Sequence, residues 1–410
     1  MDILPILKAL RRHKVIIWLL MLEIALTCAI VCNGVFLIVQ RMQHMDMPSG
    51  VAEHDLVLIR QAPIKPPPDR YARAREDLAA LQQIPGVQAV GMANQVPFGG
   101  SSSNANVMLS PTQPHRTLNA ATYFSENLVR TFGLRLIAGR KLQPGDYVDA
   151  DVVIRGLSGG SDRGFPMPTV ISKALAQRLW PGESPLGKLF WLTPKASLRV
   201  VGVVATLARA NAYDIATAQY SMIIPVRMGA DKDEFYVLRT HPQDRQRVRA
   251  AAITALKRAD PERVIAHVQT FDEVRGVYFQ DDRAMAGMLV GVILAVLLIT
   301  GLGIVGLASF WVAQRRKQIG IRRALGATRA DILRYFQTEN FLIVTFGIVV
   351  GMLLAYGLSL LLMQHYEMAH LPLAYLPIGA VALWLIGQLA VLGPALRAAA
   401  VPPVVATRSV

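Results

Sequence analysis

The stretch 182–189, GESPLGKL, comes nearest to a known chemical motif in this sequence. Its spacing matches G-x-x-x-x-G-K of a phosphate-binding loop, in which backbone N–H groups and a lysine hold nucleotide phosphates. Leu189 stands where the motif needs a Ser or Thr hydroxyl for Mg²⁺, and no strand with a carboxylate partner follows. A Gly/Pro turn before a strand at 189–192 is the better interpretation. We therefore expect no ATP site here.

Glu23 places a carboxylate inside the first long apolar run of the chain. An acidic side chain within a membrane costs about 2.5–3.5 kcal/mol on insertion scales, so it should face other helices or a partner subunit. One hypothesis is a contact with a proton or a substrate. The other is a buried polar clasp to another helix, with Gln337 or Asn340 at similar depth. We favour the clasp, because the sequence shows no polar path through the membrane.

Cysteines and histidines show no arrangement suited to metal binding or catalysis. Cys28 and Cys32 both fall inside the first apolar run and read as small, buried apolar residues. Eight histidines are scattered along the chain, and the pair His365 and His370 has no third ligand nearby. The sequence supports no Ser-His-Asp or Cys-His arrangement. We predict no metal site, no catalytic residue and a non-enzymatic chain.

Hydropathy indicates the helices that must position these residues. Hydrophobic residues make up 53% of the 410 positions, and the mean hydropathy is +0.36. These values are too apolar for an ordinary soluble protein of this length. A membrane-spanning helix needs about 20 mostly apolar residues. Four stretches qualify, and we predict transmembrane helices at residues 15–39, 284–312, 341–363 and 376–396.

The charges that flank these four predicted spans orient them. Basic residues precede the first span, fill the segment between the second and third, and follow the fourth. By the positive-inside rule, segments 1–14, 313–340 and 397–410 are then cytoplasmic, and segments 40–283 and 364–375 lie outside. The first apolar run is longer than the roughly 7–15 residues of a signal-peptide core, so we expect a retained anchor.

The formal net charge of +15 raises the question of a nucleic-acid partner. Topology signals account for much of this charge, and no element interleaves basic with aromatic residues. We therefore expect membrane lipid as a partner and no nucleic acid.

The outer segment alternates strand-like and helix-like patterns. Short apolar runs bounded by Gly and Pro predict strands, and apolar residues at helical spacing predict helices. The combination predicts a mixed α+β domain. The predicted strands are 54–60, 87–92, 170–171, 189–192, 198–205, 220–225, 235–240 and 263–269, the predicted helices are 69–83 and 242–259, and the Ser- and Asn-rich stretch 97–113 reads as a loop.

The segment 314–340, QRRKQIGIRRALGATRADILRYFQTEN, is the most informative stretch of the chain. Gly326 is placed to end a first helix as a C-terminal cap residue. Thr328, followed three residues later by Asp331, predicts a capping box that begins a second helix. This second helix then continues into the third span.

Apolar residues of this segment recur at helical spacing. Ile321, Leu325, Ile332 and Phe336 should share one apolar face, with arginines covering the other. Such a segment could lie on anionic lipid as an interfacial helix. It could equally be a docking knob for a cytoplasmic partner, and composition alone leaves the two interpretations about even.

A family resemblance rests on several independent stretches. One span, a large outer domain and three more spans follow in that order, and the chain carries IGIRRALGAT at 319–328. In these features it resembles the MacB/FtsX-like permeases of bacterial ABC transporters. Further similar stretches are LAALQQIPGVQAV (78–90), TFGLRLIAGRKL (131–142), ISKALAQRLWPGESPLGKLFWL (171–192), VVGVV (200–204) and the tail PALRAAAVPPVVATRSV (394–410).

The resemblance implies an α-helical membrane protein with four transmembrane helices and a large mixed α+β extracytoplasmic domain, in the bacterial inner membrane. It implies two permease copies, as a homodimer or heterodimer, above ABC ATPase subunits that bind the ATP and Mg. With about fourteen residues before the first span, we expect that ATPase on a separate chain. Carried onto this sequence, the ATPase-coupling residues are Ile319, Gly320, Ile321, Arg322, Arg323, Ala324, Leu325, Gly326 and Ala327.

The chain also departs from the family pattern. Gln318 stands where the family usually has Glu, and the tail at 401–405 (VPPVV) lacks the usual acidic residues. The resemblance therefore implies the class of protein, but not the details of how this chain would pair with an ATPase.

Three functions remain open from the sequence. The first is efflux of a periplasmic compound, through a periplasmic adaptor and an outer-membrane channel, driven by movement of the outer domain. The second is regulation of a cell-wall hydrolase by the same movement, which the large outer domain disfavours mildly. The third is a membrane ligand sensor, which lacks an output domain in the short cytoplasmic segments.

Overall fold

The computed structural model describes residues 14–65, 67–100, 102–113, 118–158, 164–230, 234–366 and 372–400, with backbone alone at 14–16 and 362–366. The chain forms two compact units. We call Met1–Gln43 with Asp281–Val410 the membrane unit, and His44–Gln280 the outer domain. The predicted N-terminal segment, His370 and the departing tail at 401–405 lie outside the described residues, as does the side chain of His365.

The outer domain is built on a mixed sheet in which twelve strands are described. The strands are β1 (Leu56–Ala62), β2 (Val87–Ala93), β3 (Asn104–Val107), β4 (Leu118–Glu126), β5 (Leu136–Gly139), β6 (Val148–Asp149), β7 (Met167–Ser172), β8 (Leu189–Thr193), β9 (Ala196–Val204), β10 (Ser221–Arg227), β11 (Glu234–Thr240) and β12 (Val264–Thr270).

The strand order divides the sheet into two halves. The main path runs β12-β1-β11-β2-β4-β10-β7-β9-β5, with β3 on β4, β6 on β10 and β8 on β9. The first half, from β12 to β2, is antiparallel throughout. The second half contains the parallel pairs β4–β10 and β7–β9. Parallel neighbours need a crossover connection, and helices of the outer domain supply part of it.

Both faces of this sheet are covered, which explains its apolar strands. In β1, Val57 and Ile59 pack into one hydrophobic cluster, while the alternate residues Leu56 and Leu58 pack into another on the opposite face. All four side chains are buried. Strands that are buried on both faces read as continuous apolar runs, as this one does.

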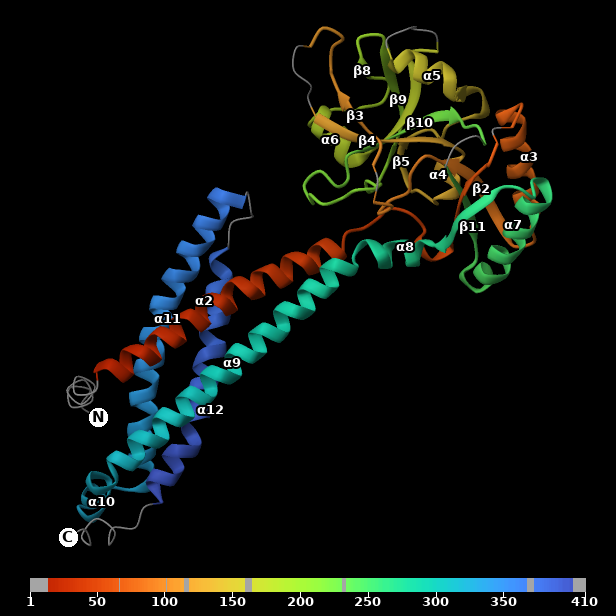
Figure 1. Ribbon diagram of the computed structural model, residues 1–410. Coiled ribbons are helices and arrows are strands. Elements are labelled where there is room, and N and C mark those ends of the chain that lie inside the picture. Colours follow the sequence, from red (N-terminus) through yellow and green to blue (C-terminus); the bar gives the residue numbers. More distant parts are fainter. Residues whose placement is uncertain are drawn as a thin grey trace. The chain divides into compact units, whose positions relative to one another are not determined.

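Helices cover the two faces. Figure 1 shows α3 and α7 near β2 and β11, and their residues Ala74, Leu81, Val248 and Leu256 belong to the first cluster. The second cluster takes in residues of α4, of α8 and of the loop between β9 and β10. The helices are α3 (Arg70–Gln82), α4 (Leu128–Thr131), α5 (Ala150–Leu157), α6 (Lys173–Leu179), α7 (Arg245–Ala259) and α8 (Phe271–Tyr278), with 3₁₀ turns at Glu53–Asp55, Pro144–Asp146 and Pro242–Asp244.

The mixed α+β class that the sequence predicts is confirmed, and one local prediction is wrong. The stretch 97–113 was expected to be a loop, but Asn104–Val107 forms β3, which pairs with β4. Its sequence NANV has only four residues, of which Val107 alone is buried. It is therefore too short and too poor in β-branched or aromatic residues to identify a strand from the sequence. Its assignment as a strand rests on its antiparallel hydrogen bonds to β4.

A buried ion pair ties α3 to the sheet. Asp77 accepts two hydrogen bonds from the Arg263 guanidinium, both at 2.9 Å. The Tyr236 hydroxyl of β11 donates a third at 2.7 Å. The side chains of Arg263 and Asp77 are 2% and 0% exposed. Burial raises the pKa of Tyr236 well above its ordinary value, and the Asp77 charge adds to the rise.

Glu126, at the end of β4, gives the outer domain a pH-dependent contribution to stability. Burial raises the pKa of this carboxyl, and Arg227 and Arg75 oppose the rise. Because the folded-state pKa exceeds the unfolded one, ionised Glu126 destabilises the fold at neutral pH, and the penalty fades as pH falls.

We expect Glu126→Gln to raise the unfolding temperature of the full chain near neutral pH. The gain should vanish toward about pH 4, where the unfolded carboxyl is also protonated. Thermal unfolding of both chains across this pH range measures the difference. A gain that is the same at every pH would contradict the assignment.

The membrane unit contains four long apolar helices among its described residues, as the sequence predicts. They are α2 (Lys14–Met45), α9 (Gln280–Gln314), α11 (Arg329–Tyr366) and α12 (Leu376–Ala399), of which α2 extends two residues into the outer domain. A short helix, α10 (Arg316–Ala324), lies between α9 and α11, and a 3₁₀ turn, Leu373–Tyr375, precedes α12. The stretches that are long and apolar enough to span a membrane are Ile17–Met45, Gln280–Gln314, Arg329–Leu361 and Leu373–Ala399.

α2 packs tightly against α11 and α12 through small residues. Cys28 and Cys32 are fully buried and form no disulfide, which agrees with their interpretation as small apolar residues. A Cβ added at Gly351 of α11 would lie 2.5 Å from the Cys28 Cβ. Only glycine fits at such a distance. Gly379 of α12 stands equally close to the Cys32 Sγ.

α2 and α9 are joined by polar contacts along their length. The Thr27 and Thr300 hydroxyls lie 2.7 Å apart and form a buried hydrogen bond. Arg41 donates to Asp282 at 2.8 Å. The two contacts hold the antiparallel register of the pair, because sliding one helix would break both.

Candidate coupling surface of the membrane unit

In the connection between α9 and α11, Gly326 ends the short helix α10 as the sequence predicts. α10 ends at Ala324, and Gly326 follows with a φ of +99°. This left-handed conformation suits glycine and confirms the predicted C-terminal cap. The N–H groups of Gly326 and Ala327 donate to the carbonyls of Arg323 and Arg322, at 3.2 and 3.0 Å. The chain therefore leaves α10 in a fixed direction.

α11 begins with the predicted capping box. The Thr328 Oγ1 accepts from the Asp331 N–H at 3.2 Å, and the Asp331 Oδ2 accepts from the Thr328 N–H at 3.0 Å. The two residues thereby satisfy free backbone donors at the start of the helix. The helix continues without interruption to Tyr366.

One side of α10 is anchored on the helices beneath it. Ile319 is 5% exposed and packs with Ile332 and Phe336 of α11. Residues from the end of α12, among them Ala395, complete this cluster. Arg323 also donates to the Ala399 carbonyl at 3.1 Å. A displacement of α10 would therefore also move the ends of α11 and α12 that pack against it.

The predicted shared apolar face is wrong in part. Ile332 and Phe336 are buried, but Ile321 and Leu325 are 48% and 82% exposed. The prediction assumed one continuous helical phase. The left-handed Gly326 interrupts the helix, so α10 and α11 point their apolar residues in different directions. Leu325 and Ile321 instead form an exposed apolar knob.

Charged and small residues surround this knob. Arg322 is exposed and lies over the Tyr335 ring, 4.8 Å from its centroid. Gln318, the departure from the family pattern, is also exposed. Of the other predicted coupling residues, Ala324 and Gly326 are exposed, Arg323 and Ala327 are half-buried, and Gly320 is buried with Ile319. We call the exposed surface of residues 316–329 the coupling surface.

A buried ion pair that the sequence reasoning missed supports the coupling surface from below. Arg315, at the start of α10, donates to both oxygens of Glu339 in α11, at 3.1 and 2.8 Å. The Glu339 side chain is 1% exposed. Arg315 also lies over the Trp311 ring, 5.8 Å from its centroid. An acidic residue just before the third predicted span, with a basic residue just after the second, was the available signal.

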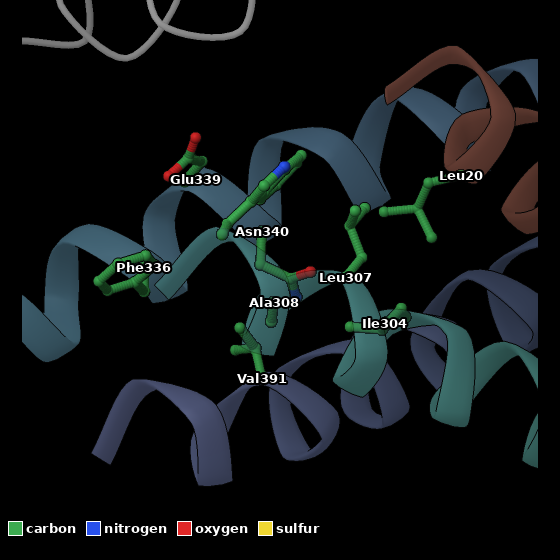
Figure 2. A pocket seen from close by; sticks show the side chains of 9 residues that line it. Leu20, Ile304, Leu307, Ala308, Phe336, Glu339, Asn340 and Val391 are labelled. Carbon is green, nitrogen blue, oxygen red and sulfur yellow. The ribbon is translucent and has the colours of Figure 1, made fainter. Parts of the chain in front are cut away.

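Figure 2 shows a pocket where the four long helices meet. It has room for about one water molecule. The lining residues are Leu20 of α2, Ile304, Leu307, Ala308 and Trp311 of α9, Phe336, Glu339 and Asn340 of α11, and Val391 of α12.

Among the described residues, no hydrogen bond joins Glu23 to either expected partner, Gln337 or Asn340. The Asn340 side chain donates to the Gly387 carbonyl of α12 at 2.8 Å. Glu23 is half-buried and lies beside Gly303 of α9, where an added Cβ would come within 2.9 Å of its carboxylate. Glycine at 303 makes room for the carboxylate between α2 and α9.

The phosphate-loop-like stretch 182–189 is a turn before β8, as predicted. Gly182 and Gly187 have φ of +76° and +80°, and strand β8 begins at Leu189. The described residues contain no group of three or more His, Cys, Asp or Glu side chains that could hold a metal ion.

These features define a membrane protein of four apolar helices that carries a mixed α+β extracytoplasmic domain between the first and second. The family model of the MacB-like periplasmic core domain matches residues 19–271, and that of the FtsX-like permease C-terminal region matches residues 290–403. The chain therefore belongs to the MacB/FtsX-like family of ABC transporter permeases.

Curated relatives support this assignment at modest identity. The chain is 25% identical over 289 residues to the uncharacterized ABC transporter permease YknZ of Bacillus subtilis, covering 68% of this chain and 65% of that protein. It is 27% identical over 254 residues to the macrolide export ATP-binding/permease protein MacB of Neisseria meningitidis serogroup B, covering 61% and 37%. The chain thus spans less than two thirds of the length of these relatives.

Solved structures of the same two kinds of protein also match. The extracellular domain of YknZ aligns with 51% of this chain and 100% of its own, at 15% identity and a TM-score of 0.32. The periplasmic region of MacB from Actinobacillus actinomycetemcomitans aligns with 56% and 94%, at 13% identity and a TM-score of 0.34.

Proposed function

We propose that this chain is a non-catalytic permease subunit that converts ATP binding by a separate ABC ATPase into movement of its outer domain. ATP and Mg would be bound by that ATPase. The observation that carries the proposal is the coupling surface, where exposed Ile321 and Leu325 stand on a helix whose opposite side is anchored to α11 and α12. An exposed apolar knob with charged surroundings suits a protein partner.

The charges of the coupling surface determine what a protein partner must present to it. Arg316, Lys317, Arg322 and Arg329 are exposed around the knob, so a complementary groove would have an apolar floor and an acidic rim. In this proposal the coupling surface and both termini lie in the cytoplasm, and the protein resides in the bacterial inner membrane, in line with the positive-inside rule.

We further propose that the task is export of a periplasmic compound by an assembly with two permease copies. The MacB relatives carry export in their names. A periplasmic adaptor and an outer-membrane channel would complete the route.

The experiment is ATP turnover by a candidate ATPase purified with and without this chain in detergent. We expect the chain to stimulate turnover and to show none by itself. Deleting residues 319–328 should abolish the stimulation, because the deletion removes the coupling surface. Turnover that is unchanged by the deletion, or turnover by this chain alone, would overturn the proposal.

A further inference from the structure

A cavity of about 30 Å³ lies between α10 and the first turns of α11, within the membrane unit. The buried part of its lining is apolar, because Ile319, Ile332 and Phe336 line it and each is at most 5% exposed. The polar side chains around it are Arg315, Gln318, Arg322 and Tyr335. We call this space the basic cavity.

The polar lining of the basic cavity offers hydrogen-bond donors and no carboxylate. A guanidinium group has only donors, and an amide and a phenol each supply donors as well. The Arg322 guanidinium lies over the Tyr335 ring, 4.8 Å from its centroid. Among the described residues, no carboxylate forms an ion pair with Arg322. Its charge therefore has no counter-ion in this part of the chain.

The second guanidinium group of the basic cavity is only partly neutralised. Arg315 uses its Nη1 for both hydrogen bonds to the buried Glu339, whereas a guanidinium has five N–H donors. One carboxylate is therefore set against two guanidinium groups, and the local charge is positive. The apolar part of the lining strengthens the attraction of an anion to these groups. Arg316 and Lys317, which are exposed nearby, add to the same potential.

The size of the basic cavity and the arrangement of its donors suit a phosphate group. A volume of about 30 Å³ holds two or three groups of the size of a water molecule, at about 10–15 Å³ each. Phosphate oxygens are of this size. The donors come from two elements, with Arg315, Gln318 and Arg322 at α10 and Tyr335 on α11. A phosphate group presents three acceptor oxygens, whereas a carboxylate presents two.

Gln318 makes the charge of the basic cavity a property of this chain. Its side chain is neutral where the family usually has Glu. A carboxylate at this position would stand among the donors and would cancel the excess of positive charge. Gln318 and Arg322 are both exposed, so an anion can enter the cavity beside them.

We propose that the basic cavity binds one phosphate group, carried by an anionic lipid headgroup or by a free phosphate ion, through Arg315, Gln318 and Arg322. With Tyr335 beside it, the bound group would add a contact between α10 and α11. The proposal goes beyond the coupling function and does not rest on it, because binding to the chain requires no ATPase. A failure of one proposal is thus distinguishable from a failure of the other.

The test follows the fluorine resonance of 3-fluorotyrosine at position 335 in the full chain, purified without an ATPase in an uncharged detergent. Tyr335→Phe identifies this resonance among those of the 11 tyrosines. One arm titrates inorganic phosphate at constant ionic strength. The other titrates dihexanoyl phosphatidylglycerol, with dihexanoyl phosphatidylcholine as its control. We expect a saturable shift, and the ligand that produces it in each arm distinguishes the free ion from the lipid headgroup.

Variants then test which side chains hold the phosphate. We expect Gln318→Glu to abolish the saturable shift, and Arg322→Gln to weaken binding about tenfold, because a charged hydrogen-bond donor is lost. Arg334→Gln removes an exposed cation of α11 that does not line the cavity. This matched control should leave the affinity unchanged.

Three results would overturn the proposal. The first is the absence of a saturable shift with both ligands. The second is a shift that persists in Gln318→Glu, because the anion would then bind elsewhere. The third is an acetate titration that matches the phosphate titration in affinity, because the cavity would then be a carboxylate site.

Discussion

Replacing Asp77 with alanine is expected to destabilise the outer domain by about 3–5 kcal/mol, the usual cost of leaving one partner of a buried ion pair unpaired. Arg263 would keep its charge at 2% exposure with no carboxylate to neutralise it. Tyr236 would lose its acceptor in the same step. Since about 1.4 kcal/mol is a factor of ten, opening of this region should become roughly a hundred- to several-thousand-fold more frequent.

Amide hydrogen exchange of the full chain in detergent measures this effect on α3 and β11. Glu76→Ala is the matched control, because Glu76 is the preceding residue of the same helix and its pair with Arg73 is on the surface. Exposed pairs of this kind contribute at most about 1 kcal/mol. Similar exchange in the two variants would mean that Asp77 does not hold α3 to the sheet.

A double variant, Asp77→Leu with Arg263→Met, should recover part of the lost stability. Buried ion pairs can often be replaced by apolar residues of similar volume without net loss. Recovery would show that the unpaired charge causes the damage to the single variant. A double variant as unstable as Asp77→Ala would point to lost packing instead.

Substituting Leu325 and Ile321 with aspartate is the second change for which we expect a large effect. Loss of an apolar anchor at the centre of an interface typically costs about 2 kcal/mol or more, which is roughly thirtyfold in affinity. The new carboxylates would also face the acidic rim that we propose for the partner. Stimulated ATP turnover should therefore fall by at least an order of magnitude.

The fold should tolerate these two substitutions, because both side chains are exposed in the isolated chain. Ile64→Asp is the matched control, since Ile64 is 63% exposed in the outer domain. Leu325→Met should retain turnover by keeping the apolar contact. If Ile64→Asp lowers turnover as strongly as Leu325→Asp, the effect does not arise at the coupling surface.

Local sequence signals predicted much of the membrane unit. The spans follow from hydropathy, and Gly326 and the Thr328–Asp331 box follow from turn and capping chemistry, which involve neighbouring residues. The exposure of Leu325 could not be predicted in this way. It depends on the change of chain direction at Gly326, which separates α10 from α11. It depends also on the residues of α12 that cover Ile319.

Long-range pairs were beyond the reach of the sequence. Asp77 and Arg263 are separated by 186 positions, and neither carries a local signal of its partner. Strand β3 depends in the same way on β4 for its pairing. Arg315 and Glu339 are nearer, 24 positions apart, but they lie on either side of the turn at Gly326, and no local spacing rule pairs them.

The most direct test of the coupling claim is an ATP-dependent distance in the assembled complex. Spin labels at Lys195→Cys would report the separation of the two outer domains in a complex of two permease copies with the ATPase. We predict that a non-hydrolysable ATP analogue changes this distance, and that Leu325→Asp abolishes the change. A distance that is insensitive to the nucleotide, in a complex that still hydrolyses ATP, would contradict the account.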